Sequence, residues 1–144
     1  MTEPIEIVVG VDRSEGASRA VKWALAEAAA RPARVTAVMA WSYLDQQPEP
    51  GHATFEPGYT AHSAEHSLHS YLVEAVGDDA ARSIAQRTVN DLPARALLAA
   101  AADADLLVLG TRGLGGFKGL LLGSVAQQLV SHSPCPVVVV PPER

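Results

Sequence analysis

Short apolar runs alternate with helical patterns along the chain. The runs are rich in Val, Leu and Ile and are bounded by glycine, proline or polar residues, which is typical of buried β-strands. The run over 82–89 is less apolar, and its assignment rests on the order of the elements around it. The predicted strands are residues 5–11, 35–41, 82–89, 106–109 and 137–140.

Between these runs, apolar residues recur every three or four positions, which predicts helices with one apolar face. Ser14 is a suitable N-cap for the first helix, with Glu15 in its first turn, and this helix ends near Pro32. Residues 42–60 are rich in proline and glycine and predict a long irregular loop. The remaining predicted helices run from about residue 61 to 76, from Asn90-Asp91-Leu92-Pro93 through Ala101, and from 124 to about 131.

Strands that alternate with helices predict parallel pairing with right-handed crossovers. We therefore expect one α/β domain over 1–144. It should be a single open five-stranded parallel sheet, doubly wound and Rossmann-like in the order 3-2-1-4-5, with four helices. Ligands of such sheets bind beyond the carboxyl ends of the strands, where the strand order reverses. With the first and fourth strands as neighbours, Asp12 and Gly110 would meet at that crevice.

The fourth predicted strand opens into a loop with glycines at positions 110, 113, 115, 116, 119 and 123. Glycine lets a backbone come close to a ligand, and the positive end of the helix that follows favours anions. Ser124 and Gln127 have the Ser-x-x-Gln spacing of a capping box, which predicts that the Ser124 side chain caps this helix. The loop is therefore either a phosphate-binding loop or only a turn.

Two segments far apart in the sequence form one recognisable pattern. Gly110 is followed after two residues by Gly113 and, after nine more, by Gly123-Ser124. Together with Val9-Gly10-Val11-Asp12 and Ser14, this spacing closely resembles the ATP-binding members of the universal stress protein family. The resemblance covers nearly the whole chain in the order of its elements and is weakest over 45–64.

The resemblance implies an ATP site with Mg²⁺. Gly123, the Ser124 hydroxyl and the Val125 amide would hold the phosphates. The residues that the resemblance implies in ATP binding are Val11, Asp12, Trp41, Gly110, Thr111, Arg112, Gly113, Gly123, Ser124 and Val125.

Four side chains of this pattern allow more than one role. Asp12 would accept from the ribose hydroxyls or join the Mg²⁺ shell through water, and it could also cap the first helix together with Ser14. The backbone of Trp41 would lie beside adenine, whereas its side chain could belong only to the core. Arg112 and Lys118 would add positive charge toward the phosphates, or stay solvated until a ligand arrives.

The implied function is an ATP-binding regulator of the stress response, a homodimer formed through the strand Val137–Val140. A monomer with a covered sheet edge is the alternative assembly. Other functions are a slow ATP hydrolase or phosphotransferase, and a dimerisation module without nucleotide. Against a fast enzyme, the chain has no Gly-Lys-Ser/Thr phosphate loop and no obvious base for a water. Against the dimerisation module, the glycine spacing is intact.

Composition narrows the partners and the location. The net charge of −5 argues against nonspecific binding to nucleic acid or acidic membranes, and no apolar run approaches the length of a membrane span. No signal peptide is visible and there is a single cysteine, which together favour a cytoplasmic location.

Histidine and cysteine are weaker candidates for chemistry. His62, His66 and His69 share one stripe of a predicted helix, a spacing that can bind a metal, but a solvated flank explains it more simply and we expect no metal held by protein side chains alone. Cys135 is predicted to be a buried apolar residue and not a nucleophile.

Overall fold

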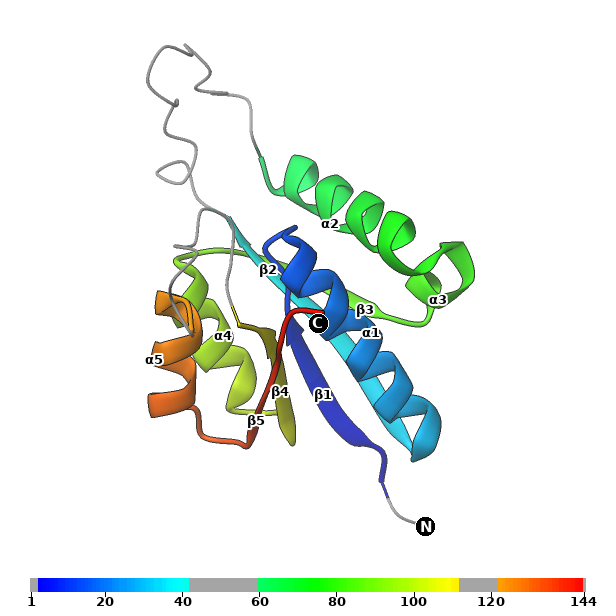
Figure 1. The fold of residues 1–144 in the computed structure, drawn as a ribbon. Coiled ribbons are helices and arrows are strands. Elements are labelled where there is room, and N and C mark those ends of the chain that lie inside the picture. Colours follow the sequence, from blue (N-terminus) through cyan, green and yellow to red (C-terminus); the bar gives the residue numbers. More distant parts are fainter. Residues whose placement is uncertain (1–2, 42–59, 112–121, 144) are drawn as a thin grey trace.

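The computed structural model describes residues 3–41, 60–111 and 122–143 and shows a five-stranded sheet between two layers of helices (Figure 1). Every neighbouring pair of strands is parallel, and the order is β3-β2-β1-β4-β5. The predicted doubly wound α/β fold is therefore confirmed. The strands are β1 Ile5–Gly10, β2 Ala33–Trp41, β3 Ala85–Asn90, β4 Leu106–Gly110 and β5 Val137–Val140.

Helices cover both faces of the sheet. In Figure 1, α1 and α2 lie over one face, while α4 and α5 lie over the other. No helix within the described ranges is long and apolar enough to cross a membrane. The helices are α1 Glu15–Ala30, α2 Ala61–Val76, α3 Asp78–Arg82, α4 Pro93–Ala101 and α5 Ser124–His132.

The short helix α3 corrects the sequence-based prediction of four helices and of a strand beginning at residue 82. Gly77 has a φ of 89°, a conformation that glycine adopts without a Cβ penalty, and it ends α2 and precedes α3. The Ser83 side chain then donates to the carbonyl oxygen of Ala80 at 2.6 Å. Because these residues form a helical turn, β3 begins only at Ala85. Within the described residues, all four predicted helices are present and each has nine or more residues.

The core consists of two clusters, one on each face of the sheet. Side chains of successive strand residues point to opposite faces, so Ile7 and Val9 pack under α1 and α2 while Val8 packs under α4 and α5. Leu107 and Val108 divide between the clusters in the same way. Because both faces are covered, β4 is apolar throughout and β1 is apolar apart from Glu6 near its start, which explains the apolar runs in the sequence.

The strand order places the candidate site. After β1 the chain builds the sheet outward through β2 and β3, then returns to place β4 on the other side of β1. The carboxyl ends of β1 and β4 are therefore neighbours, with Val9 paired to Val108 two positions before Gly110. This is the point of strand reversal at which ligands bind in open α/β sheets.

Candidate functional site

The turn between β1 and α1 is held in one conformation by its own hydrogen bonds. Val11 donates its amide to the carbonyl oxygen of Val38 at 2.9 Å, which continues the pairing with β2. The Asp12 carboxylate accepts from the Ser14 amide at 3.0 Å. Between them Arg13 has a φ of 66°, the left-handed region that is unfavourable for residues with a Cβ. The turn thus presents Asp12 in a defined position at the carboxyl edge of the sheet.

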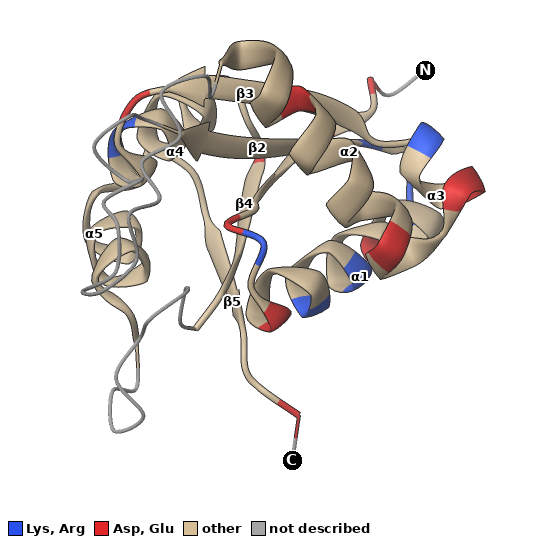
Figure 2. Ribbon diagram, turned by 90° about the horizontal axis from the view of Figure 1, so that it is seen from above, with Lys and Arg blue, Asp and Glu red and all other residues tan. Residues whose placement is uncertain are grey.

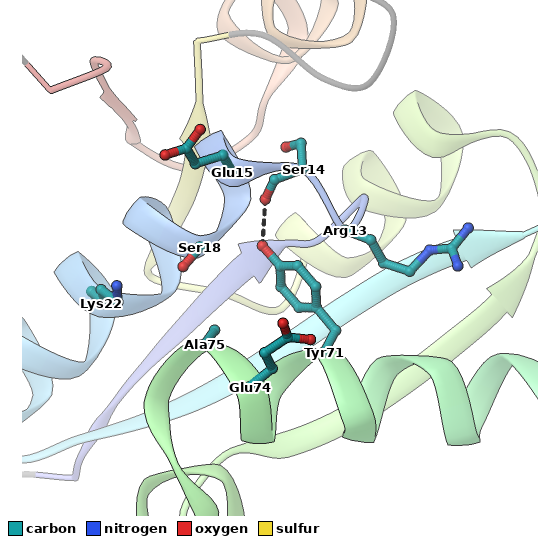
Figure 3. Close-up of a pocket in the computed structure, with 8 residues that line it drawn as sticks. All are labelled: Arg13, Ser14, Glu15, Ser18, Lys22, Tyr71, Glu74 and Ala75. Atoms are coloured by element: carbon teal, nitrogen blue, oxygen red, sulfur yellow. Dashed lines mark hydrogen bonds between the residues drawn. The ribbon is translucent and has the colours of Figure 1, made fainter.

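Ser14 caps α1, as predicted. Its side chain accepts from the Ala17 amide at 3.1 Å, and Glu15 lies in the first turn. Ser14 is also buried, at 9% exposure. Its backbone carbonyl accepts from the hydroxyl of Tyr71, on α2, at 2.5 Å (Figure 3).

The Tyr71 hydroxyl lies in an environment that disfavours its ionisation. Burial, and after it the negative charge of Asp12, raise the pKa of Tyr71 to about 12, against smaller opposing effects from the Ser18 hydrogen bond and Arg19. The phenol therefore stays protonated over the physiological range and remains a hydrogen-bond donor. It also forms one wall of a mostly polar pocket of about 320 Å³ between α1 and α2 (Figure 3).

The end of β4 packs against the first turn of α1. A Cβ atom on Gly110 would lie 2.8 Å from the backbone carbon and 2.9 Å from the backbone oxygen of Gly16, too close for any side chain. Gly110 was predicted to let the backbone come close to phosphate. The structure gives it a packing role of its own, because this contact sets the distance between β4 and the turn that carries Asp12.

The start of α5 lies directly beside the end of β4. The amide of Gly123 donates to the carbonyl oxygen of Thr111 at 2.6 Å. The carboxyl end of β4, the β1–α1 turn and the beginning of α5 therefore meet at one edge of the sheet. α5 has no acidic residue in its first turn, and its ribbon is tan in Figure 2, the colour of residues other than Lys, Arg, Asp and Glu.

The predicted capping box at α5 is wrong. Gly123 is the N-cap, in an extended conformation, and as a glycine it makes no side-chain cap hydrogen bond. Ser124 is the first helical residue, one position too late for its hydroxyl to reach back over the first turn. Gln127 instead donates its side-chain amide to the carbonyl oxygen of Leu122 at 2.9 Å. Ser124 is exposed.

Trp41 occupies the carboxyl end of β2, next to β1. Its side chain is half-buried against the α1–α2 cluster, which confirms a core contact. Its backbone carbonyl accepts from the Asp91 amide at 3.1 Å, so the end of β2 is tied to the start of the β3–α4 turn. That the Trp41 backbone also lies beside adenine stays a prediction.

The structure brings most of the predicted site together at the carboxyl edge of the sheet. Arg112, Gly113 and Lys118 lie outside the described residues. Of the predicted set, β1 and the turn after it supply Val11 and Asp12, the end of β4 supplies Gly110 and Thr111, and the start of α5 supplies Gly123, Ser124 and Val125.

Two residues of the site had no assigned role in the sequence analysis. Tyr71 lies within the predicted helix from about residue 61 to 76, and neither Tyr71 nor Gly16 was singled out. A tyrosine within an apolar stripe is a usable signal, because its hydroxyl needs a partner when buried.

The three histidines of α2 lie on a solvent-exposed flank of the helix, the simpler of the two interpretations of their spacing. His62, His66 and His69 are exposed, and the Nδ1 atom of His69 lies 3.2 Å from the side-chain amide of Gln86. Among the described residues, no three His, Cys, Asp or Glu side chains are grouped closely enough to hold a metal. Cys135 is half-buried against the α4–α5 cluster rather than fully buried, and its amide donates to Ser133 Oγ at 3.2 Å.

Fold and site together define a small doubly wound α/β domain with a candidate ligand crevice at its point of strand reversal. The sequence profile of the universal stress protein family matches residues 6–141, and the chain belongs to this family. It is 34% identical over 133 residues to universal stress protein Rv2623 of Mycobacterium tuberculosis, a match that covers 92% of this chain and 44% of that protein. The chain therefore spans less than half the length of this curated relative.

Solved structures show the same fold. A universal stress protein crystallised in complex with cAMP is 30% identical, with a TM-score of 0.65 over 96% of this chain and 98% of that one. Universal stress protein UspA from Lactobacillus plantarum, at 22% identity, superposes with a TM-score of 0.72 over 97% of this chain and 99% of its own.

Proposed function

We propose that this chain holds ATP, together with Mg²⁺, in the crevice between the β1–α1 turn and the start of α5, and that it regulates a stress response through nucleotide occupancy. The observation that carries the proposal is the hydrogen bond between the Thr111 carbonyl and the Gly123 amide, which brings an uncapped helix start to the end of β4. Backbone amides at such a start are donors for phosphate. The solved relative in complex with cAMP supports a nucleotide as the class of ligand.

The phosphate donors follow from the helix geometry. The Gly123 amide is engaged by Thr111, so the donors that we assign to phosphate are the amides of Ser124 and Val125 and the exposed Ser124 hydroxyl. First-turn amides have no carbonyl partner inside their own helix, and α5 has no acidic first-turn residue to repel a phosphate. Gly123 then acts by fixing where the helix begins.

Asp12 is assigned to the ribose hydroxyls or to water on Mg²⁺. A carboxylate accepts several hydrogen bonds, so the bond from the Ser14 amide orients Asp12 without preventing contact with a ligand. One carboxylate, nucleotide phosphates and water make a usual coordination shell for Mg²⁺. The residues at this edge therefore fit a Mg²⁺-nucleotide. The metal would neutralise phosphate charge and draw the phosphates toward Asp12.

The proposal includes a homodimer through β5. This strand forms one edge of the sheet, and each of Val137–Val140 is only half-buried. An apolar strand with one unpaired edge favours pairing with a second copy around a two-fold axis.

The direct test uses the wild-type chain purified without added nucleotide. Native mass spectrometry is expected to show a mass increase equal to ATP or a related nucleotide. After removal of bound ligand, ATP with Mg²⁺ should raise the melting temperature, and ADP, AMP and cAMP serve as comparison ligands. A clean ligand-free mass together with no thermal shift from any of these nucleotides would rule the proposal out.

A further inference from the structure

Tyr71 links the second helix layer to the turn that carries Asp12. Figure 3 shows its side chain rising from α2 between the two helices toward Ser14. Its hydroxyl donates to the Ser14 carbonyl at 2.5 Å, across 57 positions of sequence. Its ring packs against the α1–α2 core cluster, which limits the directions in which the hydroxyl can point.

Ser14 takes part in several of the hydrogen bonds that fix the β1–α1 turn. It donates its amide to Asp12, caps α1 with its side chain and accepts the Ser18 amide on its carbonyl at 3.3 Å. A displacement of Ser14 would therefore move the Asp12 carboxylate and the start of α1 together. The left-handed conformation of Arg13 adds to this dependence, because a strained backbone keeps its conformation only where its surroundings hold it.

We infer that Tyr71 is a positioning residue of the nucleotide site, whose hydroxyl fixes the β1–α1 turn so that Asp12 meets the ribose and the metal. The inference rests on the proposed function and adds to it a residue from α2. The proximity of Asp12 is reflected in Tyr71 itself, since the carboxylate contributes to the raised pKa of the phenol. The burial of Ser14 favours this direct contact over solvation by water.

A purely structural role for Tyr71 predicts something different. If the hydroxyl only joined α2 to α1, its loss would lower stability and change nucleotide affinity to the same extent whatever residue occupied position 12. If it acts through Asp12, its loss should matter only while Asp12 is present. A double-mutant cycle separates the two roles.

The experiment measures Mg²⁺-ATP affinity by isothermal titration calorimetry for wild type, Tyr71→Phe, Asp12→Ala and the double variant. Tyr71→Phe keeps the packed ring and removes only the donor, and it is expected to weaken binding about fivefold, the effect of one ordinary hydrogen bond. In the Asp12→Ala background, the same change should alter affinity less than about twofold. Ser83→Ala is the matched control, because it removes a side-chain hydrogen bond at the end of α3 and should leave affinity unchanged.

The outcomes are distinguishable. If wild type and Tyr71→Phe bind Mg²⁺-ATP with equal affinity, Tyr71 has no positioning role and the proposed function still stands. An equal loss in both backgrounds would reduce Tyr71 to a structural contact. Absence of binding by the wild-type chain would overturn the nucleotide site itself. Thermal unfolding of each variant shows whether it is folded; should Tyr71→Phe unfold, Tyr71→His, which also has an aromatic ring but a shorter reach, replaces it in the cycle.

Discussion

Gly110, at the end of β4, lies directly against the backbone of Gly16 in the first turn of α1. A Cβ atom at position 110 would be 2.8 Å from the Gly16 backbone carbon, and neither backbone can move without displacing a whole element. The contact joins the two halves of the candidate site, since the β1–α1 turn precedes Gly16 and the glycine-rich loop follows Gly110.

Gly110→Ala is therefore expected to destabilise the fold by about 2 kcal/mol, the usual cost of overpacking. Gly10→Ala is the matched control, because its added Cβ would meet only the flexible side-chain ends of Leu109 and Leu97, at 2.9 Å. Urea unfolding of both variants measures the difference. Equal stability losses would show that the approach of Gly110 to Gly16 is no tighter than an ordinary side-chain contact.

Ser124→Ala tests whether the Ser124 side chain caps α5, as the sequence predicted, or does not, as the structure shows. Because Ser124 does not cap α5, its loss should change the free energy of unfolding by less than about 0.5 kcal/mol. Loss of its hydroxyl from the proposed phosphate site should weaken Mg²⁺-ATP binding about fivefold. Ser14→Ala, which removes a real cap, should cost about 1 kcal/mol in the same unfolding assay. A comparable stability loss in Ser124→Ala would show that Ser124 caps α5 after all.

Alkaline pH should destabilise the wild type more than Tyr71→Phe. The pKa of Tyr71 is raised from the ordinary value of 10.0 to about 12 in the folded protein, first by burial and then by the Asp12 carboxylate. The unfolded chain therefore loses this proton first. The contribution of the protonated phenol is fully present below about pH 10 and is lost as pH rises toward 12.

The measurement is the difference in unfolding free energy between wild type and Tyr71→Phe, which cancels the titration of all other groups. That difference should be constant from about pH 7 to 9 and should fall above about pH 10. A difference that stays flat through about pH 11 would mean that the phenol ionises with an ordinary pKa.

Burial on both faces explains why the sequence predicted the sheet so well. β4 is a continuous apolar run and β1 is apolar apart from Glu6. Each lies between helices with one apolar face, which is enough to predict parallel pairing. The position of Asp12 relative to the end of β4 then followed from the strand order alone.

The errors arose where local patterns are ambiguous. The pattern Gly-Ser-Val-Ala-Gln suits an N-cap at either Gly123 or Ser124, and the local sequence does not report the contact of Gly123 with Thr111 that accompanies the observed N-cap at Gly123. The acidic segment before Arg82 has no apolar period long enough to predict α3. The hydrogen bond of Tyr71 joins residues 57 positions apart, and no local pattern reports it.

The edge strand β5 offers the sharpest test of the proposed dimer. Leu107 donates its amide to the carbonyl oxygen of Pro136, and partners alternate along a parallel strand, so the amides of Val137 and Val139 point away from β4. Val139→Pro removes one of these outward donors and leaves the hydrogen bonds to β4 intact. It should convert the dimer to a monomer in size-exclusion chromatography with light scattering. Val130→Lys, an exposed change on α5, is the control and should leave the dimer unchanged. A Val139→Pro variant that stays dimeric would place the interface elsewhere, and a monomeric wild type would remove the dimer from the proposal.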